Sequence, residues 1–438
     1  MTTMHIFLSA IGILMLFLLG GVSLPFCFAA ALACMVFVGG VPTGSLFLYG
    51  FTQMTSLTLL AVPMFVIAGS LISYGGIADR LLSLSQIFVG RVKGSLGVIC
   101  VLACGFIGAI SGSAFTGIAA IGPVMIPKMM ENGYERGFAT ALVSSASILG
   151  MLIPPSAAVI LYGWCTGASI LGGFLSTVVP GVLVMIFFSL INIVYARKHC
   201  RTSTITVEQS TGTQEHQKKK LSVFISAIPA LLLPVIILGG IYGGIFTPSE
   251  AASVAALVCL VIGIFVYKAL TPKSLLGVFK DSANSIGSIF TMIFFCYLFS
   301  QSLVIEQVPQ HLVTVFLSLT DNKYVILLIV NLFLLCIGMI ASDTVGIVLC
   351  APLLLPVVAA YGISPVHFCA IMIVNLAAGG LTPPYASIMY FGMKVGNCKF
   401  SEVFGPTMQF LFYGYLPVII LTTYVEPISM TLPRLMGY

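Results

Sequence analysis

The sequence predicts an all-α polytopic membrane protein built from two inverted repeats, and three observations support this fold class. The first is composition: of 438 residues, 59% are hydrophobic and only 7% are charged. A soluble domain carries about 25% charged residues, so this chain has too much apolar surface to hide in water. Its long apolar runs also argue against a β-barrel, whose strands alternate over short segments. The other two observations are an internal repeat and paired prolines inside apolar spans.

Hydropathy predicts a series of membrane spans, because a helical crossing needs about 20 apolar residues. The predicted spans are 4–21, 23–40, 55–76, 95–110, 137–164, 170–195, 222–245, 250–267, 284–304, 324–340, 366–392 and 406–425. We interpret the first as a span rather than a signal peptide, because it lacks a basic n-region and another apolar span follows at once. Two short amphipathic segments, 79–93 and 268–283, are either arms in the membrane interface or ordinary loops.

One long polar segment, 197–220, divides the chain and reads RKHCRTSTITVEQSTGTQEHQKKK. By the positive-inside rule it is predicted to be a basic cytoplasmic linker between a first repeat, 1–196, and a second repeat, 221–438. The net charge of +6 therefore does not indicate nucleic-acid binding, because much of it lies in this segment without interleaved aromatic residues. The 12 cysteines form no CxxC pair, so they are expected to act as small hydrophobes rather than as disulfides or metal ligands.

The repeat is visible in two short stretches, GMLIPPSA at 150–157 and GGLTPPYA at 379–386. Residue 150 pairs with residue 379, an offset of 229, and the same offset without a gap pairs further Gly, Pro and small residues. These pairs are Ser113 with Ser342, Gly117 with Gly346, Pro123 with Pro352, Pro127 with Pro356, Gly133 with Gly362, Ala141 with Ala370 and Gly163 with Gly392. Because Gly and Pro dominate, backbone shape is what is repeated. If each half crosses the membrane an odd number of times, the repeats are inverted, as in many secondary transporters.

The paired prolines, Pro154–Pro155 and Pro383–Pro384, are predicted to break two membrane helices. Lipid cannot satisfy the freed carbonyls, so they need a partner in the protein or a desolvated cation. Unwound carbonyls suit Na⁺, and the half-helix that follows presents its positive end to an anion. Hydroxyl groups beside the breaks could contribute, from Ser156, Thr382 and Ser387. The alternative is a pair of proline kinks that only shape packing.

Two stretches of small and polar residues, GAISGSAFTG at 108–117 and IASDTVG at 340–346, are predicted to be the turns of re-entrant hairpins. Backbone exposed at membrane depth is tolerated only where it lines a cavity or is buried in protein. The alternative is a helix-packing face, where Gly and Ser allow close approach. The residues that fit both interpretations are Ser111, Gly112, Ser113 and Thr116.

Four further polar residues are candidates. Asp343 is the only acidic residue in the apolar stretch 324–363. It could accept backbone N–H bonds that orient a hairpin tip, help to hold Na⁺, or cap a half-helix, and these roles can coexist. Asn375 could add a carbonyl ligand or make a contact between helices. Lys394 could face an acidic substrate or extend to the membrane interface. His367 is expected at the start of a helix.

The combined motifs resemble the large membrane subunit of TRAP transporters, the tripartite ATP-independent periplasmic systems. The stretches that carry the resemblance are ISGSAFTGIAAIGPVMIPKMMENGY at 110–134, IPPSAAVILYG at 153–163, GGIFTPSEAASVAAL at 243–257 and PVHFCAIMIVNLAAGGLTPP at 365–384. The resemblance extends over about 10–425. This chain departs from the family pattern in two places. The family often has Gly soon after the second Pro-Pro, where this chain has Tyr385-Ala386-Ser387. A basic residue is also not expected at the position that Lys394 occupies.

The resemblance implies an elevator-type ion transporter in the bacterial inner membrane, in which hairpins and broken helices slide against a scaffold. It implies Na⁺ as the coupling ion and a small organic acid as substrate, for example a C4-dicarboxylate or sialic acid. The implied Na⁺ ligands are Ser111, Gly112, Ser113, Pro154 and Pro155 in one half, and Ser342, Asp343, Gly379, Thr382 and Pro383 in the other. The candidate substrate residues are Ser111, Ser113, Thr116, Ser156, Thr382, Ser387 and Lys394. The implied partners are a small membrane subunit, a periplasmic binding protein and the lipid bilayer.

Other function classes receive less support from the sequence. A stand-alone sodium/anion symporter of related architecture is the nearest alternative, and the presence or absence of a binding protein separates the two. An aspartyl intramembrane protease would need two close acids within the membrane, and only Asp343 qualifies. A serine intramembrane protease would need a nearby histidine, and the apolar spans around Ser111 and Ser113 contain none. A G-x-x-x-x-G-K-[ST] phosphate loop is absent, so ATP-driven transport is not indicated. The sequence therefore predicts a transporter and not an enzyme.

Overall fold

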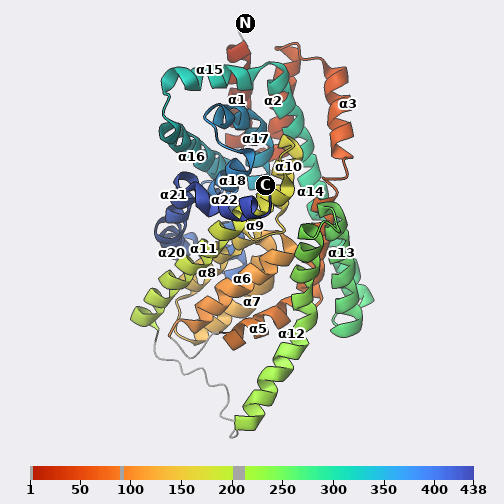
Figure 1. Cartoon of the computed structure of the whole chain (residues 1–438), viewed down its shortest axis with the longest axis vertical. Helices are drawn as coiled ribbons and strands as arrows, with labels where there is room; N and C mark the ends of the chain where they lie inside the picture. Colours follow the sequence, from red (N-terminus) through yellow and green to blue (C-terminus); the bar gives the residue numbers. More distant parts are fainter. Residues whose placement is uncertain (1–2, 89–92, 201–212) are drawn as a thin grey trace.

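The computed structural model describes residues 3–88, 93–200 and 213–438, and these residues form helices joined by short connections (Figure 1). No strand occurs in these three ranges. Within them, seven helices are long and apolar enough to cross a membrane, and two bent helix pairs add to that number. The prediction of an all-α polytopic membrane protein is therefore confirmed.

The first half contains two short apolar helices, an arm, a hairpin and a broken helix. Its helices are α1 (Thr3–Leu19), α2 (Leu24–Phe37), α3 (Thr43–Met54), α4 (Ala61–Tyr74), α5 (Ile77–Phe88), α6 (Ser95–Ser111), α7 (Ala114–Glu131), α8 (Arg136–Ser147), α9 (Leu149–Leu152), α10 (Ala157–Thr166) and α11 (Ile170–His199). The turn of the hairpin, between α6 and α7, is formed by Gly112 and Ser113. The broken helix runs from α8 through α9 to α10 and is bent by 41°.

The second half repeats the hairpin and the broken helix in the same order. Its helices are α12 (Thr213–Tyr242), α13 (Pro248–Val261), η1 (Ile262–Val266), α14 (Pro272–Ile305), α15 (Val308–Leu319), α16 (Lys323–Ile340), α17 (Asp343–Ala360), α18 (Pro365–Gly379), α19 (Ser387–Gly396), α20 (Phe400–Gln409), η2 (Phe410–Tyr415), α21 (Leu416–Tyr424) and α22 (Glu426–Leu435). The elements η1 and η2 are π-helical. Shifted by the offset of 229, the starts of α6, α7, α8 and α10 fall within one residue of the starts of α16, α17, α18 and α19.

The two hairpins open at opposite ends of the long helix α11. Near the C-terminal end of α11, the Asn192 side-chain amide donates to the Gly94 carbonyl (2.7 Å), just before the first hairpin begins. Near its N-terminal end, Gly172 packs against Val366, just after the second hairpin ends. Twenty residues of helix separate these contacts, which is about 30 Å. The two hairpins therefore enter from opposite faces, as inverted repeats require.

The halves also cover one another. The second part of the first broken helix, α10, packs on hairpin helix α17, and α19 of the second half packs on α7 and α8. The Tyr162 hydroxyl donates to the Pro365 carbonyl across this boundary (2.8 Å). Each hairpin is thus covered by a helix that the other half supplies.

Several predicted spans differ from the observed helices. The two amphipathic segments have different outcomes: 79–93 falls largely on the separate helix α5, bent by 67° from α4, whereas 268–283 is mostly the first part of the continuous helix α14. The described part of the first segment is therefore a separate helix, with residues 89–92 outside the described residues, and the second segment is mostly helix rather than a loop. That either segment lies in the membrane interface stays a prediction. The helix within the predicted span 55–76 begins only at Ala61. Helices α3, α15 and α22 were not predicted, because hydroxyl, Gly and Pro residues lower their mean hydropathy.

The basic segment 197–220 is helical at both ends. Arg197, Lys198 and His199 form the last turn of α11, and α12 begins at Thr213, so the polar residues prolong membrane helices rather than forming one loop. Residues 201–212 of this segment lie outside the described residues. Figure 1 shows the start of α12 extending away from the rest of the helices.

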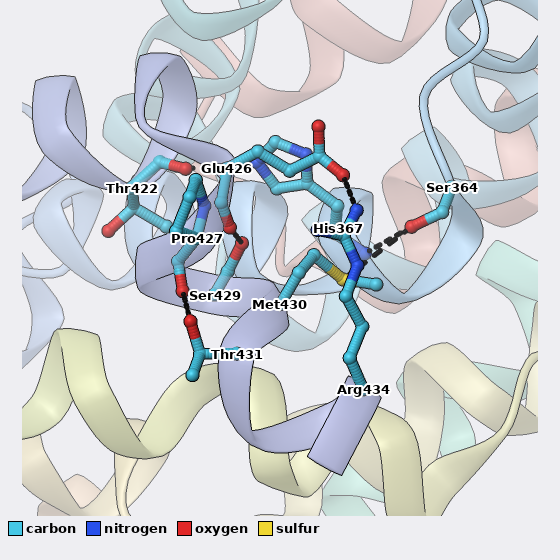
Figure 2. A network of polar contacts seen from close by, with 9 residues as sticks. All are labelled: Ser364, His367, Thr422, Glu426, Pro427, Ser429, Met430, Thr431 and Arg434. Atoms are coloured by element: carbon cyan, nitrogen blue, oxygen red, sulfur yellow. Dashed lines mark hydrogen bonds and ion pairs between the residues drawn. The ribbon is translucent and has the colours of Figure 1, made fainter. Parts of the chain in front are cut away.

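The C-terminal helix α22 packs on α11 and on α18. His367 lies in the first turn of α18, as expected, and its N–H donates to the capping hydroxyl of Ser364 (3.1 Å). The His367 Nε2 atom lies 3.0 Å from the Thr422 carbonyl, so this nitrogen carries the proton. Figure 2 shows how Met430 and the ion pair between Glu426 and Arg434 lie over these contacts.

Pairs of glycines allow each broken helix to cross the hairpin of its own half with the two backbones in contact. A Cβ atom at Gly108 of α6 would lie 2.7 Å from the Gly150 Cα atom of α9. In the second half, a Cβ atom at Gly379 of α18 would overlap the backbone of Gly338 in α16. Since these contacts are backbone to backbone, no flexible side chain can move aside.

We expect Gly379→Ala to lower the free energy of unfolding by about 1–3 kcal/mol, because the added methyl group forces α16 and α18 apart. The measurement is thermal unfolding of the purified full chain in detergent. The control is Gly405→Ala in α20, where an added Cβ atom meets nothing within 4 Å. Equal midpoints for the two variants would contradict the backbone crossing.

Candidate functional site

The hairpin tips and the two helix breaks surround one cavity of about 310 Å³. Both halves contribute to its wall, together with α4 and α14. The lining residues are Val62, Phe65, Val66, Ser111, Gly112, Ser113, Ala114, Phe115, Met151, Ala157, Ala158, Leu161, Ser288, Ile289, Met292, Ser342, Asp343, Thr344, Tyr385 and Ile388. The structure therefore brings together Ser111, Gly112, Ser113, Ser342 and Asp343, which come from sequence positions more than two hundred residues apart.

Four helices begin at this cavity. The first residues of α7, α10 and α17, which are Ala114, Ala157 and Asp343, line it, and so does Ile388, the second residue of α19. Each helix start carries about half a positive charge from the helix dipole. Some of the first N–H groups already have partners: those of Ile388 and Met389 donate to the Gly380 carbonyl, and that of Val345 donates to the Ser342 hydroxyl. Among the described residues that line the cavity there is no Lys, Arg or His. Backbone dipoles are thus the source of positive potential in the cavity.

In the first half, the predicted cation ligands lie beside one another. The Ala157 N–H donates to the Gly112 carbonyl (3.4 Å), which joins the hairpin tip to the start of α10. Gly112 has a φ of +62°, and a Cβ atom there would lie 2.7 Å from the Pro155 carbonyl oxygen. The peptide bond between Pro154 and Pro155 is cis. The tip and the break are therefore in direct backbone contact.

The second half brings its predicted ligands together in the same way. The Tyr385 N–H donates to the Met339 carbonyl at the end of α16 (2.9 Å). The Thr382 hydroxyl lies 3.2 Å from the Ala378 carbonyl and 3.1 Å from the Gly379 carbonyl, so it covers the end of α18. Pro383 and Pro384 are joined by a cis peptide bond. Both breaks thus lie against a hairpin tip.

Asp343 is not the cap of α17. The cap is Ser342, whose hydroxyl accepts from the Val345 N–H (3.3 Å), and Asp343 is the first residue of the helix. Its carboxylate interacts with the N–H groups of Asp343 and Thr344 while facing the cavity. Asp343, for which the sequence left several roles open, is therefore an acid that lines the cavity, and the neighbouring Ser342 is the helix cap.

Five residues predicted to contact substrate do not line the cavity. Thr116 is half-buried against Gly69 of α4. The Ser156 hydroxyl donates to the Met151 carbonyl (2.6 Å), and Thr382 covers the end of α18. The Ser387 side chain interacts with the Tyr385 phenol. Lys394 is exposed in the last turn of α19, where it has no place in this cavity.

Sequence reasoning missed the residues that α4 and α14 contribute. Val62, Phe65 and Ser288 come from elements that carry no motif, so periodicity offered no signal for them. Tyr385 could have been found, because it stands where this chain departs from the family pattern. Its side chain lies close to Ser342 and Asp343 across the cavity.

Asn375 makes a contact between helices, which was one of its two predicted roles. Its side-chain amide donates to Asn331 Oδ1 of α16 (2.6 Å) and to the Ile371 carbonyl (2.8 Å). The Asn331 amide in turn donates to the Thr423 hydroxyl of α21 (3.1 Å). This buried network joins the second hairpin, the second broken helix and α21 away from the cavity lining.

Two hairpins that meet two broken helices at one cavity define a class of membrane protein, the secondary transporters with a binding site between inverted repeats. The comparisons with known proteins agree with this class. Residues 11–428 match the family model "Tripartite ATP-independent periplasmic transporter, DctM component". The chain therefore belongs to the DctM family of TRAP transporter large permeases, in the bacterial inner membrane.

Characterised relatives differ in the compound for which they are named. The chain is 36% identical over 405 residues to the isethionate TRAP transporter permease protein DctMQ of Oleidesulfovibrio alaskensis. These matched residues cover 92% of this chain and 62% of that relative. It is 34% identical over 382 residues to the sialic acid TRAP transporter large permease protein SiaM of Vibrio cholerae, or 87% of each chain. It is 31% identical to the C4-dicarboxylate large permease DctM of Rhodobacter capsulatus, over 91% of each chain.

A solved structure supports the fold. The YdaH transporter of Alcanivorax borkumensis, described as having an unusual topology, matches with a TM-score of 0.61 and 17% identity. The match covers 90% of this chain and 89% of that one. At this identity, the likeness concerns the fold alone.

We expect Ala386→Gly to leave the free energy of unfolding unchanged or higher, and Ala386→Val to lower it by about 2 kcal/mol. Ala386 is buried at the start of α19 with a φ of +34°, a conformation that costs a residue with a Cβ atom about 1–2 kcal/mol. A β-branched side chain fits it worse than alanine, and glycine fits it best. Thermal unfolding of both variants in detergent tests this order, and a valine variant as stable as the glycine variant would contradict it.

Proposed function

We propose that this chain is the membrane permease of a tripartite system that takes up a small organic acid by coupling to Na⁺. The observation that supports this proposal best is the shared cavity, where four helix starts converge on a space without a cationic side chain. Helix starts favour anions because their N–H groups point at the ligand and their dipoles add. An organic carboxylate is therefore the kind of substrate that the cavity favours.

Asp343 makes a cation necessary in this proposal. Its carboxylate lines the same cavity as the proposed anionic substrate, and like charges repel strongly where water is excluded. Bound Na⁺ would neutralise this charge, so that substrate and ion bind better together than apart. The residues fit such an ion, because the donors at the tips and breaks are hydroxyl, carboxylate and backbone oxygens, which suit hard cations.

The hydroxyl groups beside the breaks fit Na⁺ in a further way. The Ser156 hydroxyl donates its proton to the Met151 carbonyl, and the Thr382 hydroxyl is directed at the end of α18. A hydroxyl whose proton is already engaged still offers oxygen lone pairs. The breaks are therefore held closed by side chains that could also present oxygen to a cation.

Family membership supports the proposed partners, which are a small membrane subunit and a periplasmic binding protein that delivers the substrate. The named relatives suggest isethionate, sialic acid and C4-dicarboxylates as compounds to test first. We also propose an elevator motion, in which hairpins and broken helices slide past α4 and α14. The cavity would then open to either face, because these two helices supply one wall of it.

Reconstituted uptake tests the proposal. The full chain is placed in liposomes with its small subunit, and uptake is measured with and without the binding protein and an inward Na⁺ gradient. Uptake that requires both supports the tripartite system. Na⁺-driven uptake without the binding protein would instead support a stand-alone symporter, and uptake without Na⁺ would contradict sodium coupling.

We expect the double variant Pro383→Ala with Pro384→Ala to lose at least about tenfold in uptake rate while still inserting into the membrane. The two alanines allow a continuous helix, which removes the backbone oxygens and the helix start from the cavity. Initial uptake rates and surface-exposed protein are the measurements. The control is Pro406→Ala, inside helix α20 and away from the cavity. Uptake equal to that of the control would contradict the role of the break.

We expect Asp343→Asn to raise the Na⁺ concentration for half-maximal uptake by about tenfold, because a loss of one charged ligand costs about 1.4 kcal/mol or more. The measurement is uptake against Na⁺ concentration at saturating substrate. Asp321→Asn, an exposed acid in the loop before α16, is the matched control. An unchanged Na⁺ dependence would remove Asp343 from the proposed ion site.

A further inference from the structure

A separate cavity, of about 500 Å³, lies between α11 and the helix formed by α20 and η2. We call it the α11 groove, and it shares no lining residue with the cavity at the hairpin tips. Its lining residues are Phe187, Leu190, Ile191, Val194, Tyr195, Lys198, His199, Gln409 and Tyr413. The proposed transport function makes no use of it.

The α11 groove is apolar along most of its length and basic at one end. On α11 its residues follow the helical repeat, from Phe187 through Leu190 and Val194 to Lys198. Leu190 and Val194 are 52% and 54% exposed, and Tyr413 on the facing helix is 71% exposed, so no part of the described protein covers them. The groove therefore opens to the outside of the helix bundle.

The length of the groove matches one leaflet of a membrane. From Phe187 to Lys198 the helix advances by eleven residues, which is a rise of about 16 Å. The hydrocarbon core of a bilayer is about 30 Å thick, so one leaflet is about 15 Å. Lys198 and His199 lie in the last turn of a helix that is long and apolar enough to span the membrane. They therefore lie at the level of the lipid head groups, with the apolar part of the groove at the level of the acyl chains.

The charge at the basic end has no partner among the described residues. Arg197 and Lys198 make no ion pair within residues 3–88, 93–200 and 213–438. His199 stacks on Tyr195 with ring centroids 4.4 Å apart, and its Nδ1 atom lies 3.2 Å from the Tyr195 carbonyl. That contact leaves Nε2 of His199 available to a ligand. The carboxylate of Glu135 lies near Tyr195 but does not line the groove.

We propose that the α11 groove binds one anionic glycerophospholipid. One acyl chain lies along the stripe that Leu190, Val194 and Tyr413 form, and the phosphate and its head group lie against Lys198, His199 and the Gln409 amide. Basic pockets between membrane helices favour anionic lipids in this way, through charge at the head group and apolar burial along the chain. A neutral lipid would use the apolar stripe alone. The site is thus defined by its preference for the anionic head group.

Binding of lipid by the purified chain tests the proposal. The full-length protein is placed in nanodiscs that contain phosphatidylglycerol and phosphatidylcholine in equal amounts, extracted gently, and its retained lipids are counted by native mass spectrometry. We expect retained phosphatidylglycerol to exceed phosphatidylcholine by at least about fivefold, since one cation near a membrane surface contributes about 1 kcal/mol. Equal retention of the two lipids would overturn the proposal.

Two variants separate the head-group contact from the apolar contact. Lys198→Gln with His199→Gln should abolish the preference for phosphatidylglycerol, whereas the control Lys273→Gln, an exposed lysine at the start of α14, should keep it. Val194→Trp should fill the groove and reduce retention of both lipids. Its control is Val182→Trp, which is also exposed on α11 but lies outside the groove. An unchanged preference in the glutamine double variant, or equal retention by the two tryptophan variants, would overturn the assignment.

Discussion

The structure depends on one constraint, which is that a helix broken inside a membrane must have its backbone satisfied by protein. Each break has a hairpin tip placed against it, and one backbone hydrogen bond joins the two, Ala157 to Gly112 in the first half and Tyr385 to Met339 in the second. Hydroxyls of Ser156 and Thr382 cover carbonyls at the helix ends. Without these partners each open carbonyl would cost several kcal/mol in hydrocarbon.

This constraint explains the distribution of glycine and the composition of the cavity. A tip can touch a break only if the two backbones approach closely, and Gly108, Gly150, Gly338 and Gly379 permit that approach at equivalent crossings. The same geometry directs four helix starts into one space. The feature that secures the backbone is therefore also the feature that places helix starts around a cavity whose described lining residues include no basic side chain. Stability and ligand chemistry have a common origin in this fold.

The repeat could be predicted in detail, and its register is accurate. The offset of 229 places Gly117 and Gly346 at equivalent positions, and in the structure they contact Ser147 and Leu376, which the same offset also pairs. Hairpins and broken helices could be predicted because Gly and Pro act on the local backbone. Helix ends were less predictable: α14 continues through a charged segment that hydropathy alone would separate from the span, because neighbouring helices support it.

The sequence by itself determined the membrane class, the duplication, the two breaks and the residues of both hairpin tips, because each of these depends on local backbone chemistry or on composition. Only the tertiary structure decided which of the candidate residues share a cavity. It placed Asp343 and Tyr385 beside Ser111 and Ser113, directed Lys394 away, and added walls from α4 and α14. The physical reason is that the two halves cover one another, and contacts between distant segments leave no periodic signal in either segment.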